Sequence, residues 1–137
     1  MREIEFRGKA LISIEELDEI GIKHKNGYVY GDLVDNSHIV TGILESNDEY
    51  ICIETWCGID SKTIGQYTGL KDKSDNKIFE GDVGWDEHNE CYGVVKFEEG
   101  KFLYVWENIA EDLQEVADGI EICGNIHENL ELSEVAE

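Results

Sequence analysis

Short runs of alternating apolar and polar residues follow one another along most of this chain, and polar turns separate them. Three runs rich in β-branched and aromatic residues cover residues 28–34, 39–44 and 50–56. Asn26-Gly27, directly before the first run, is a strong signal for a tight turn. Runs of this composition joined by short turns predict an antiparallel β-meander.

Residues 2–12 alternate in the same way and predict a half-buried strand before the meander. A short helix is predicted between the two, because Ser13 and Glu16 have the spacing of a capping box and apolar residues follow at helical intervals. Gly21 is expected to end this helix. A loop with at most one helical turn is expected after the meander, over residues 57–63.

Residues 66–83, QYTGLKDKSDNKIFEGDV, set apolar runs at 66–70 and 77–79 around a polar centre at 71–76. Short Asp, Ser and Asn side chains in this centre can bond their own backbone, which predicts a turn between two strands. The centre also resembles an oxygen-rich cation loop, but the spacing, glycine and closing glutamate of an EF-hand are missing, so a turn is favoured. Residues 80–82 predict a second turn.

The last third of the chain continues the pattern of short strands and small turns, which suggests a small closed or partly closed barrel. A short helix is predicted over residues 108–116, whose apolar residues share one face. A frayed acidic tail is predicted over residues 130–137. The predicted strands are residues 83–85, 91–97, 101–106 and 120–123.

These elements predict a mainly β protein, a β-rich α+β chain of two linked modules. Residues 1–62 are expected to form the antiparallel meander with its short helix, and residues 63–137 the barrel with its tail. A chain of 137 residues with 41% hydrophobic content is long and apolar enough to bury a core.

Acidic residues outnumber basic ones, with 32 Asp and Glu against 11 Lys and Arg and a net charge of −21. Residues 1–62 contribute −7 (6 basic, 13 acidic) and residues 63–137 contribute −14 (5 basic, 19 acidic). No basic side chain follows Lys101. Such a surface repels phosphate backbones and anionic membranes, so no direct nucleic-acid or membrane partner is expected. Solubility is the favoured explanation of the charge, and imitation of DNA is the alternative.

The chain has four cysteines but no export signal, so free and mostly buried thiols are predicted rather than disulfides. None of the nearby Cys and His pairs has the knuckle spacing of a structural zinc site or a recognisable signature of a catalytic thiol. No phosphate-binding glycine loop occurs. The sequence therefore predicts no enzyme, no metal site and no cofactor. The pairs considered are Cys52 with Cys57, His88 with Cys91, and Cys123 with His127.

Aromatic residues alternate along the strands predicted near the C-terminus. Because the surrounding charge has the wrong sign for nucleic acid, we expect them to pack in the core and across strands rather than to stack on bases. They are Tyr92, Phe97, Phe102, Tyr104 and Trp106. No run of 18 apolar residues occurs and the segment MREIEFRGK lacks the apolar core of a signal peptide, so a cytoplasmic location is expected.

Four segments, in chain order, carry a family resemblance: REIEFRGK, YVYGDLV, TIGQYTGLKDK with KIFEGDV, and EICGNIHENLEL. With them the chain resembles the YopX-like family of phage and prophage proteins from Gram-positive bacteria. The resemblance implies an SH3-like β-barrel in the C-terminal half and a homo-oligomer, and it implies no catalytic residue or cofactor. The chain departs from the family at Ser74-Asp75-Asn76, where Asn-Gly is usual, and at Leu130, where proline is usual. Both positions lie in predicted turns, so local loop geometry is left open.

The motif residues of this family have two interpretations. As structural residues, the glycines allow positive φ or close approach, the leucine packs and the acids bond turn amides. As functional residues, they form a shared interaction surface. The structural interpretation is favoured. The motif residues are Tyr67, Gly69, Leu70, Glu80, Gly81 and Asp82.

Together these observations predict a phage accessory protein in the bacterial host cytoplasm that acts as a non-catalytic protein-interaction or self-assembling module. Its expected partners are copies of itself and a host or phage protein. The alternative hypothesis is an acidic DNA mimic that inhibits a host nucleic-acid enzyme. A third hypothesis is a Cys/His metal-binding protein or enzyme.

Overall fold

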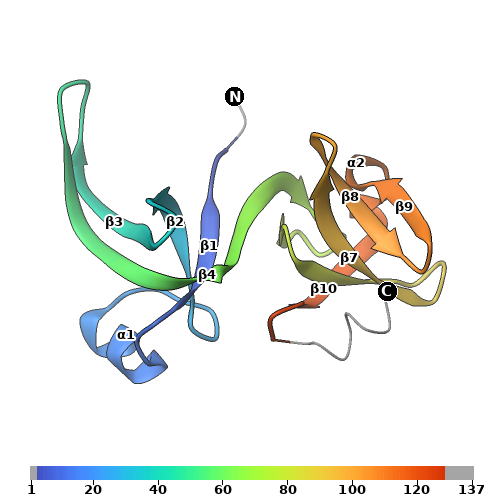
Figure 1. Ribbon diagram of the computed structural model, residues 1–137, viewed down its shortest axis with the longest axis horizontal. Coiled ribbons are helices and arrows are strands. Elements are labelled where there is room, and N and C mark those ends of the chain that lie inside the picture. Colours follow the sequence, from blue (N-terminus) through green and yellow to red (C-terminus); the bar gives the residue numbers. More distant parts are fainter. Residues whose placement is uncertain (1–2, 129–137) are drawn as a thin grey trace. The chain divides into compact units, whose positions relative to one another are not determined.

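The computed structural model describes residues 3–128, and the chain divides into two compact units (Figure 1). The N-terminal unit comprises residues 3–66 and the C-terminal unit begins at Tyr67. The predicted tail over residues 130–137 lies outside the described residues. Strands predominate and all pairings are antiparallel, so the prediction of a mainly β fold is confirmed.

Ten strands and three short helical segments follow one another along the described chain. The strands are β1 (Phe6–Ala10), β2 (Tyr28–Val34), β3 (His38–Ser46), β4 (Ile51–Lys71), β5 (Lys77–Phe79), β6 (Asp82–Asp86), β7 (Cys91–Glu98), β8 (Lys101–Trp106), β9 (Ile109–Asp112) and β10 (Ile120–Asn125). The helices are α1 (Ile14–Ile20), α2 (Leu113–Val116) and the 3₁₀ turn η1 (Ala117–Gly119).

The strands of the N-terminal unit close into a ring. β1 pairs with β2, β2 with β3 and β3 with β4, and β4 returns to pair with β1. The predicted meander is confirmed as β2, β3 and the start of β4. Helix α1 contributes to the same core through Leu17, which is fully buried beside Val29, Ile39 and Ile59.

Helix α1 begins and ends where the sequence predicts. The Ser13 side chain accepts a hydrogen bond from the Glu16 amide at 3.1 Å, which satisfies one of the free donors of the first turn. At the other end, Gly21 adopts φ 89°, and its amide donates to the Leu17 carbonyl at 3.0 Å. A left-handed glycine at this position is a common way for a helix to end.

The loop predicted over residues 57–63 is wrong, because β4 runs through it without a break. β1 lies along this segment and uses its backbone groups: Lys9 pairs with Asp60 and Ala10 with Ile59. Cys57 and Ile59 are buried in the core. The polar residues that suggested a loop lie where the register with β1 shifts. Residues 60–62 are exposed there, and Thr63 is buried and accepts the Lys9 amide at 2.8 Å.

The C-terminal unit is built on a five-stranded sheet in the order β10-β6-β7-β8-β9. The end of β4 pairs with β5 through Tyr67 with Phe79 and Lys71 with Lys77. The last strand lies beside the first strand of this sheet, and η1 directly precedes it. This order agrees with the SH3-like architecture that the family resemblance implies.

The helix predicted over residues 108–116 is wrong in its first half. Residues Ile109 to Asp112 form β9, which pairs with β8 from Trp106 to Leu103. A helix begins only after Asp112, whose carboxylate accepts the Gln114 amide at 3.0 Å. Pairing with β8, the strand directly before it in the chain, satisfies the backbone of residues 109–112, and this gain outweighs the helical spacing of their side chains.

The predicted packing of the aromatic residues is confirmed. Trp85 and Tyr92 face each other across β6 and β7 with ring centroids 4.9 Å apart. Phe97 and Phe102 do the same across β7 and β8 at 4.9 Å. Tyr104 is fully buried, and its hydroxyl donates to the Gly84 carbonyl at 2.9 Å.

Replacing Tyr104 by phenylalanine is expected to lower the free energy of unfolding of the C-terminal unit by about 1 kcal/mol, since one buried hydrogen bond is lost while the ring remains. Burial raises the pKa of this phenol, so the hydroxyl stays a donor at neutral pH. Urea-dependent hydrogen exchange, read by mass spectrometry on peptides from each unit, measures the change. An unchanged stability would mean that the bond contributes nothing net.

Candidate functional site

The turn between β4 and β5 is built around the Asp72 carboxylate, which is 5% exposed. One oxygen accepts the Ser74 and Asn76 amides, each at 2.9 Å. The other accepts the Asn76 side-chain amide at 3.2 Å and the Ile122 backbone amide of β10 at 2.8 Å. Four N–H donors thus satisfy this carboxylate, and the predicted turn is confirmed. The Ile122 bond also ties the turn to the last strand.

Burial by itself would raise the pKa of Asp72, but the hydrogen bonds from Ile122, Asn76 and Ser74 outweigh it. The pKa of this carboxyl therefore lies below its ordinary value. Each of these bonds stabilises the ionised form, so Asp72 is charged at neutral pH in the folded protein.

A second motif turn joins β5 to β6. The Asp82 carboxylate is 1% exposed and accepts the Phe79 amide at 2.7 Å. Gly81 adopts φ 92°, which strains any residue that has a Cβ atom. Its amide donates to the Val95 carbonyl at 2.8 Å, and its carbonyl accepts the Ile126 amide at 2.9 Å. Both residues hold the chain in a tight turn against β7 and the segment after β10.

Glu80 lies in the same turn between β5 and β6, and the remaining three motif residues lie on β4. The ring of Tyr67 is buried 5.5 Å from that of Phe79, centroid to centroid. Gly69 adopts φ 86° within the register shift that separates Tyr67 from Lys71. Leu70 is half-buried and packs on the core of the C-terminal unit. Gly69 itself is exposed, so the backbone of β4 is open to solvent at this point.

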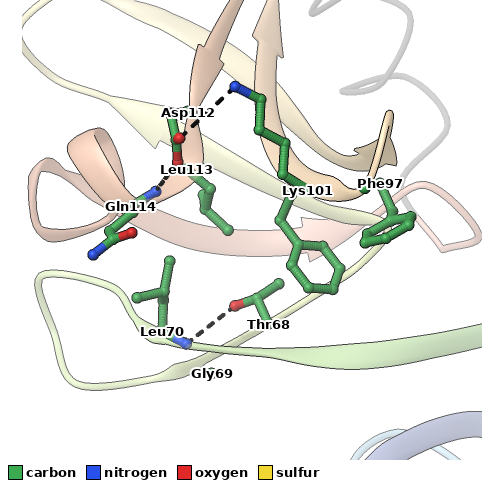
Figure 2. A pocket seen from close by; sticks show the side chains of 10 residues that line it. Thr68, Gly69, Leu70, Phe97, Lys101, Asp112, Leu113 and Gln114 are labelled. Carbon is green, nitrogen blue, oxygen red and sulfur yellow. Dashed lines mark hydrogen bonds and ion pairs between the residues drawn. The ribbon is translucent and has the colours of Figure 1, made fainter. Parts of the chain in front are cut away.

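An open cleft of about 440 Å³ lies against this exposed part of β4 (Figure 2). Leu70 from β4 and Leu113 from α2 point toward each other across it. The paired rings of Phe97 and Phe102 form a further wall, and Phe97 is 49% exposed. The cleft is lined by Thr68, Gly69, Leu70, Phe97, Gly100, Lys101, Phe102, Asp112, Leu113 and Gln114.

Two charged side chains lie at the rim of the cleft. The ammonium of Lys101 is 3.9 Å from the carboxylate of Asp112, and both side chains are partly exposed. The Thr68 hydroxyl donates to the Ile78 carbonyl at 2.8 Å and accepts the Leu70 amide at 3.2 Å, so its hydrogen-bonding capacity is used within the fold. The lining combines apolar side chains with at least as much exposed polar surface, and its apolar part is suited to holding an apolar group.

The cysteines are free, but the prediction that they are mostly buried is wrong. Cys57 alone is buried, Cys52 and Cys91 are half-buried, and Cys123 is exposed. Burial raises the pKa of Cys57 and Cys91. Although the Cys123 residue is exposed, partial desolvation of its thiol and the nearby carboxylates of Asp82 and Glu121 raise its pKa too, so all three thiols stay protonated and weakly nucleophilic at neutral pH. Within residues 3–128, no group of three or more Cys, His, Asp or Glu side chains is arranged to hold a metal ion.

The structure brings two of the six motif residues, Gly69 and Leu70, to the cleft. Tyr67, Glu80, Gly81 and Asp82 are not among the residues that line it. Sequence reasoning missed Lys101, Asp112, Leu113 and Gln114, and it treated Phe97 only as a packing residue. Phe97 is the last aromatic residue of β7 before the tight turn, and this position near a strand end was the one available signal that its ring is half-exposed.

Fold and cleft together define a small, mainly β protein of two units, with an open cleft on the second. Residues 21–134 match the family model described as YopX protein, and the chain belongs to this family. The crystal structure of protein EF1440 from Enterococcus faecalis is similar, with a TM-score of 0.64 and 22% sequence identity. The similarity covers 96% of this chain and 99% of that chain and concerns the fold. No curated protein matches the sequence. In residues 3–128, no helix has the length and apolar character needed to cross a membrane.

Proposed function

We propose that this YopX-family chain is a non-catalytic protein-interaction module of phage or prophage origin that acts in the host cytoplasm. In this proposal the cleft of the C-terminal unit receives an apolar side chain from a second copy of the chain or from a host or phage protein. The observation that carries the proposal is the half-exposed Phe97 ring beside Leu70 and Leu113. An apolar anchor that enters such a recess is how many protein interfaces obtain most of their affinity.

The lining of the cleft supports binding more than chemistry. Lys101 and Asp112 neutralise each other at the rim, and the Thr68 hydroxyl is engaged by the backbone. Proton transfer or nucleophilic attack requires a side chain of suitable pKa beside a base or acid partner. We propose that Gly69 and Leu70 belong to the interaction surface, and that Tyr67, Glu80, Gly81 and Asp82 hold the turns that present it.

Phe97→Ser tests this proposal, because it removes the exposed aromatic wall without changing charge. We expect the variant to lose at least about tenfold in affinity for a partner recovered from nuclease-treated host lysate, or for its own copies in sedimentation experiments. Val34→Ser, which alters a residue of matching 48% exposure in the N-terminal unit, is the control. Equal binding by Phe97→Ser and the wild-type chain would contradict the role of the cleft, and a turnover activity would contradict the non-catalytic assignment.

The charge distribution favours a second candidate function, that of a DNA mimic. Residues 102–128 carry seven acidic and no basic side chains, so they offer a negative track to a basic nucleic-acid enzyme. Some of these acids are engaged within the fold: Glu111 accepts the Trp106 indole N–H at 2.9 Å and Glu121 accepts the Ser74 hydroxyl at 2.8 Å. Mimicry predicts that the affinity for such an enzyme falls steeply as salt rises. A salt-independent affinity would contradict it.

A further inference from the structure

The hairpin of β3 and β4 extends beyond the closed ring of the N-terminal unit (Figure 1). β2 pairs with β3 only as far as Val40, and β1 pairs with β4 only from Ile59 onward. Within the described chain, residues 41–46 and 51–56 therefore pair with each other alone. A two-stranded ribbon of this kind is marginally stable in water and leaves a row of unpaired backbone groups along each outer edge.

The outer edge of β4 at Ile51–Trp56 is the more regular of the two edges. Where β3 pairs with β4, two residues of β3 have no partner in the register, Thr41 and Leu44, whereas Glu54 is the single such residue on β4. β1 already occupies the same edge farther along, and the Leu11 amide donates to the Gly58 carbonyl at 3.0 Å. An added strand would continue the line of β1 along this edge.

An apolar pocket of about 280 Å³ opens at the same edge. Trp56 from β4 and Ile20 from α1 contribute to it, and they are 62% and 57% exposed. These are high exposures for large apolar side chains, so the pocket is open to an incoming group. It is lined by Ile12, Ile20, Ile22, Glu54, Thr55, Trp56, Cys57 and Gly58.

Further apolar side chains are exposed along the hairpin itself. Ile43 and Ile53 are directly opposite each other and are 45% and 41% exposed, while Leu44 and Ile51 are 68% and 52% exposed. Natural proteins usually protect such edges with lysine or proline. Residues 26–61 contain neither, and they contain no arginine. Glu54 and its bulge are thus the only protective features along the Ile51–Trp56 edge within the described chain.

The charges around this surface select its partner. Helix α1 carries four acids and no basic residue, and residues 38–58 carry four more with no Lys or Arg. The nearest basic residue in sequence is Lys23, just after the pocket residue Ile22. A second copy would bring the same acidic hairpin and a net charge of −21 to the interface, so charge complementarity favours a basic partner.

We infer that the β4 edge at Ile51–Trp56 and the adjoining pocket bind an extended segment of another protein in which apolar residues alternate with lysine or arginine. Backbone hydrogen bonds along the edge supply affinity, the pocket takes one apolar side chain, and the acids of the hairpin and α1 pair with the basic residues. This surface lies in the N-terminal unit and is additional to the cleft of the proposed function. It shares with that function only the premise that the chain binds proteins.

Fluorescence anisotropy with three short synthetic peptides tests this inference. One peptide alternates valine with lysine, the second alternates valine with glutamate, and the third is the lysine peptide with alternate backbone nitrogens methylated. We expect only the first to bind, with an affinity that falls as salt rises, because binding needs both basic side chains and free edge amides. Binding of the glutamate or methylated peptide equal to that of the first would overturn the inference.

Variants locate the binding on the chain. Glu54→Gln leaves the hairpin intact and is expected to weaken binding of the lysine peptide, and Ile53→Ser is expected to weaken it at least about tenfold. Ile109→Ser, at a matching 43% exposure in the C-terminal unit, is expected to leave it unchanged. If Phe97→Ser abolished peptide binding while Glu54→Gln and Ile53→Ser left it intact, this inference would be overturned and the proposed cleft would be supported. Association of the chain with itself through the hairpin would also overturn it.

Discussion

Replacing Gly31 by alanine is expected to cost the N-terminal unit about 3 kcal/mol or more of its free energy of unfolding. A Cβ atom at this position would lie 1.9 Å from the Val40 carbonyl oxygen, which belongs to the backbone of the neighbouring strand. Gly31 also adopts φ 155°, a conformation that favours glycine. Because a backbone atom has no rotamer by which to move away, β2 and β3 must separate to admit the methyl group.

Urea-dependent hydrogen exchange read by mass spectrometry measures this loss for each unit separately, which matters because two units need not unfold together. Gly58→Ala is the matched control in the same unit, since its nearest neighbour would be the flexible Leu11 side chain at 3.5 Å. We expect the control to retain nearly all of its stability. If the N-terminal unit were equally stable in both variants, β2 and β3 would not approach each other at Gly31 and Val40 as closely as the structure shows.

Asp72→Asn is expected to lower the free energy of unfolding of the C-terminal unit by about 2 to 3 kcal/mol. Asparagine has one acceptor oxygen, which can keep the Ser74 and Asn76 amides. Its NH₂ group would then face the Ile122 amide, and two donors would meet without an acceptor. The turn after β4 would lose its bond to β10, and the part-buried Ile122 amide would lose its partner.

The same carboxylate makes the stability of this unit depend on pH. The folded pKa of Asp72 is lowered, so its contribution is fully present above the ordinary pKa of an unfolded aspartate. The contribution is lost as the pH falls from there through the lowered folded pKa. Urea unfolding at a series of acidic pH values is expected to show a smaller decrease for Asp72→Asn than for the wild-type chain.

Asp75→Asn is the control for both measurements, because it removes the same charge from an exposed side chain whose ammonium partner, on Lys71, is 3.7 Å away. Screened surface pairs of this kind contribute little, so a change below about 0.5 kcal/mol is expected. If Asp75→Asn cost as much as Asp72→Asn, net charge rather than the hydrogen bonds of Asp72 would account for the effect.

Family membership and the turn chemistry could be predicted from sequence because both depend on short segments. The polar centre of residues 71–76 predicted a turn, and the Asp72 hydrogen bonds formed within that centre explain it. The candidate cleft could not be predicted. It requires β4, β7 and α2 to converge, and the spacing of residues within each segment carries no information on that.

Local sequence is sufficient to predict which segments alternate, where α1 begins and ends, and how much negative charge the chain carries. These properties follow from neighbouring residues, whose side chains and backbone interact over one or two turns. Tertiary structure alone decided that β4 continues through residues 57–63 and that residues 109–112 form a strand rather than a helix. For residues 57–63 the partner is β1, which is distant in sequence, and for residues 109–112 it is the preceding strand β8, which forms a hairpin with β9. In both places the backbone hydrogen bonds to the partner strand outweigh the local preference.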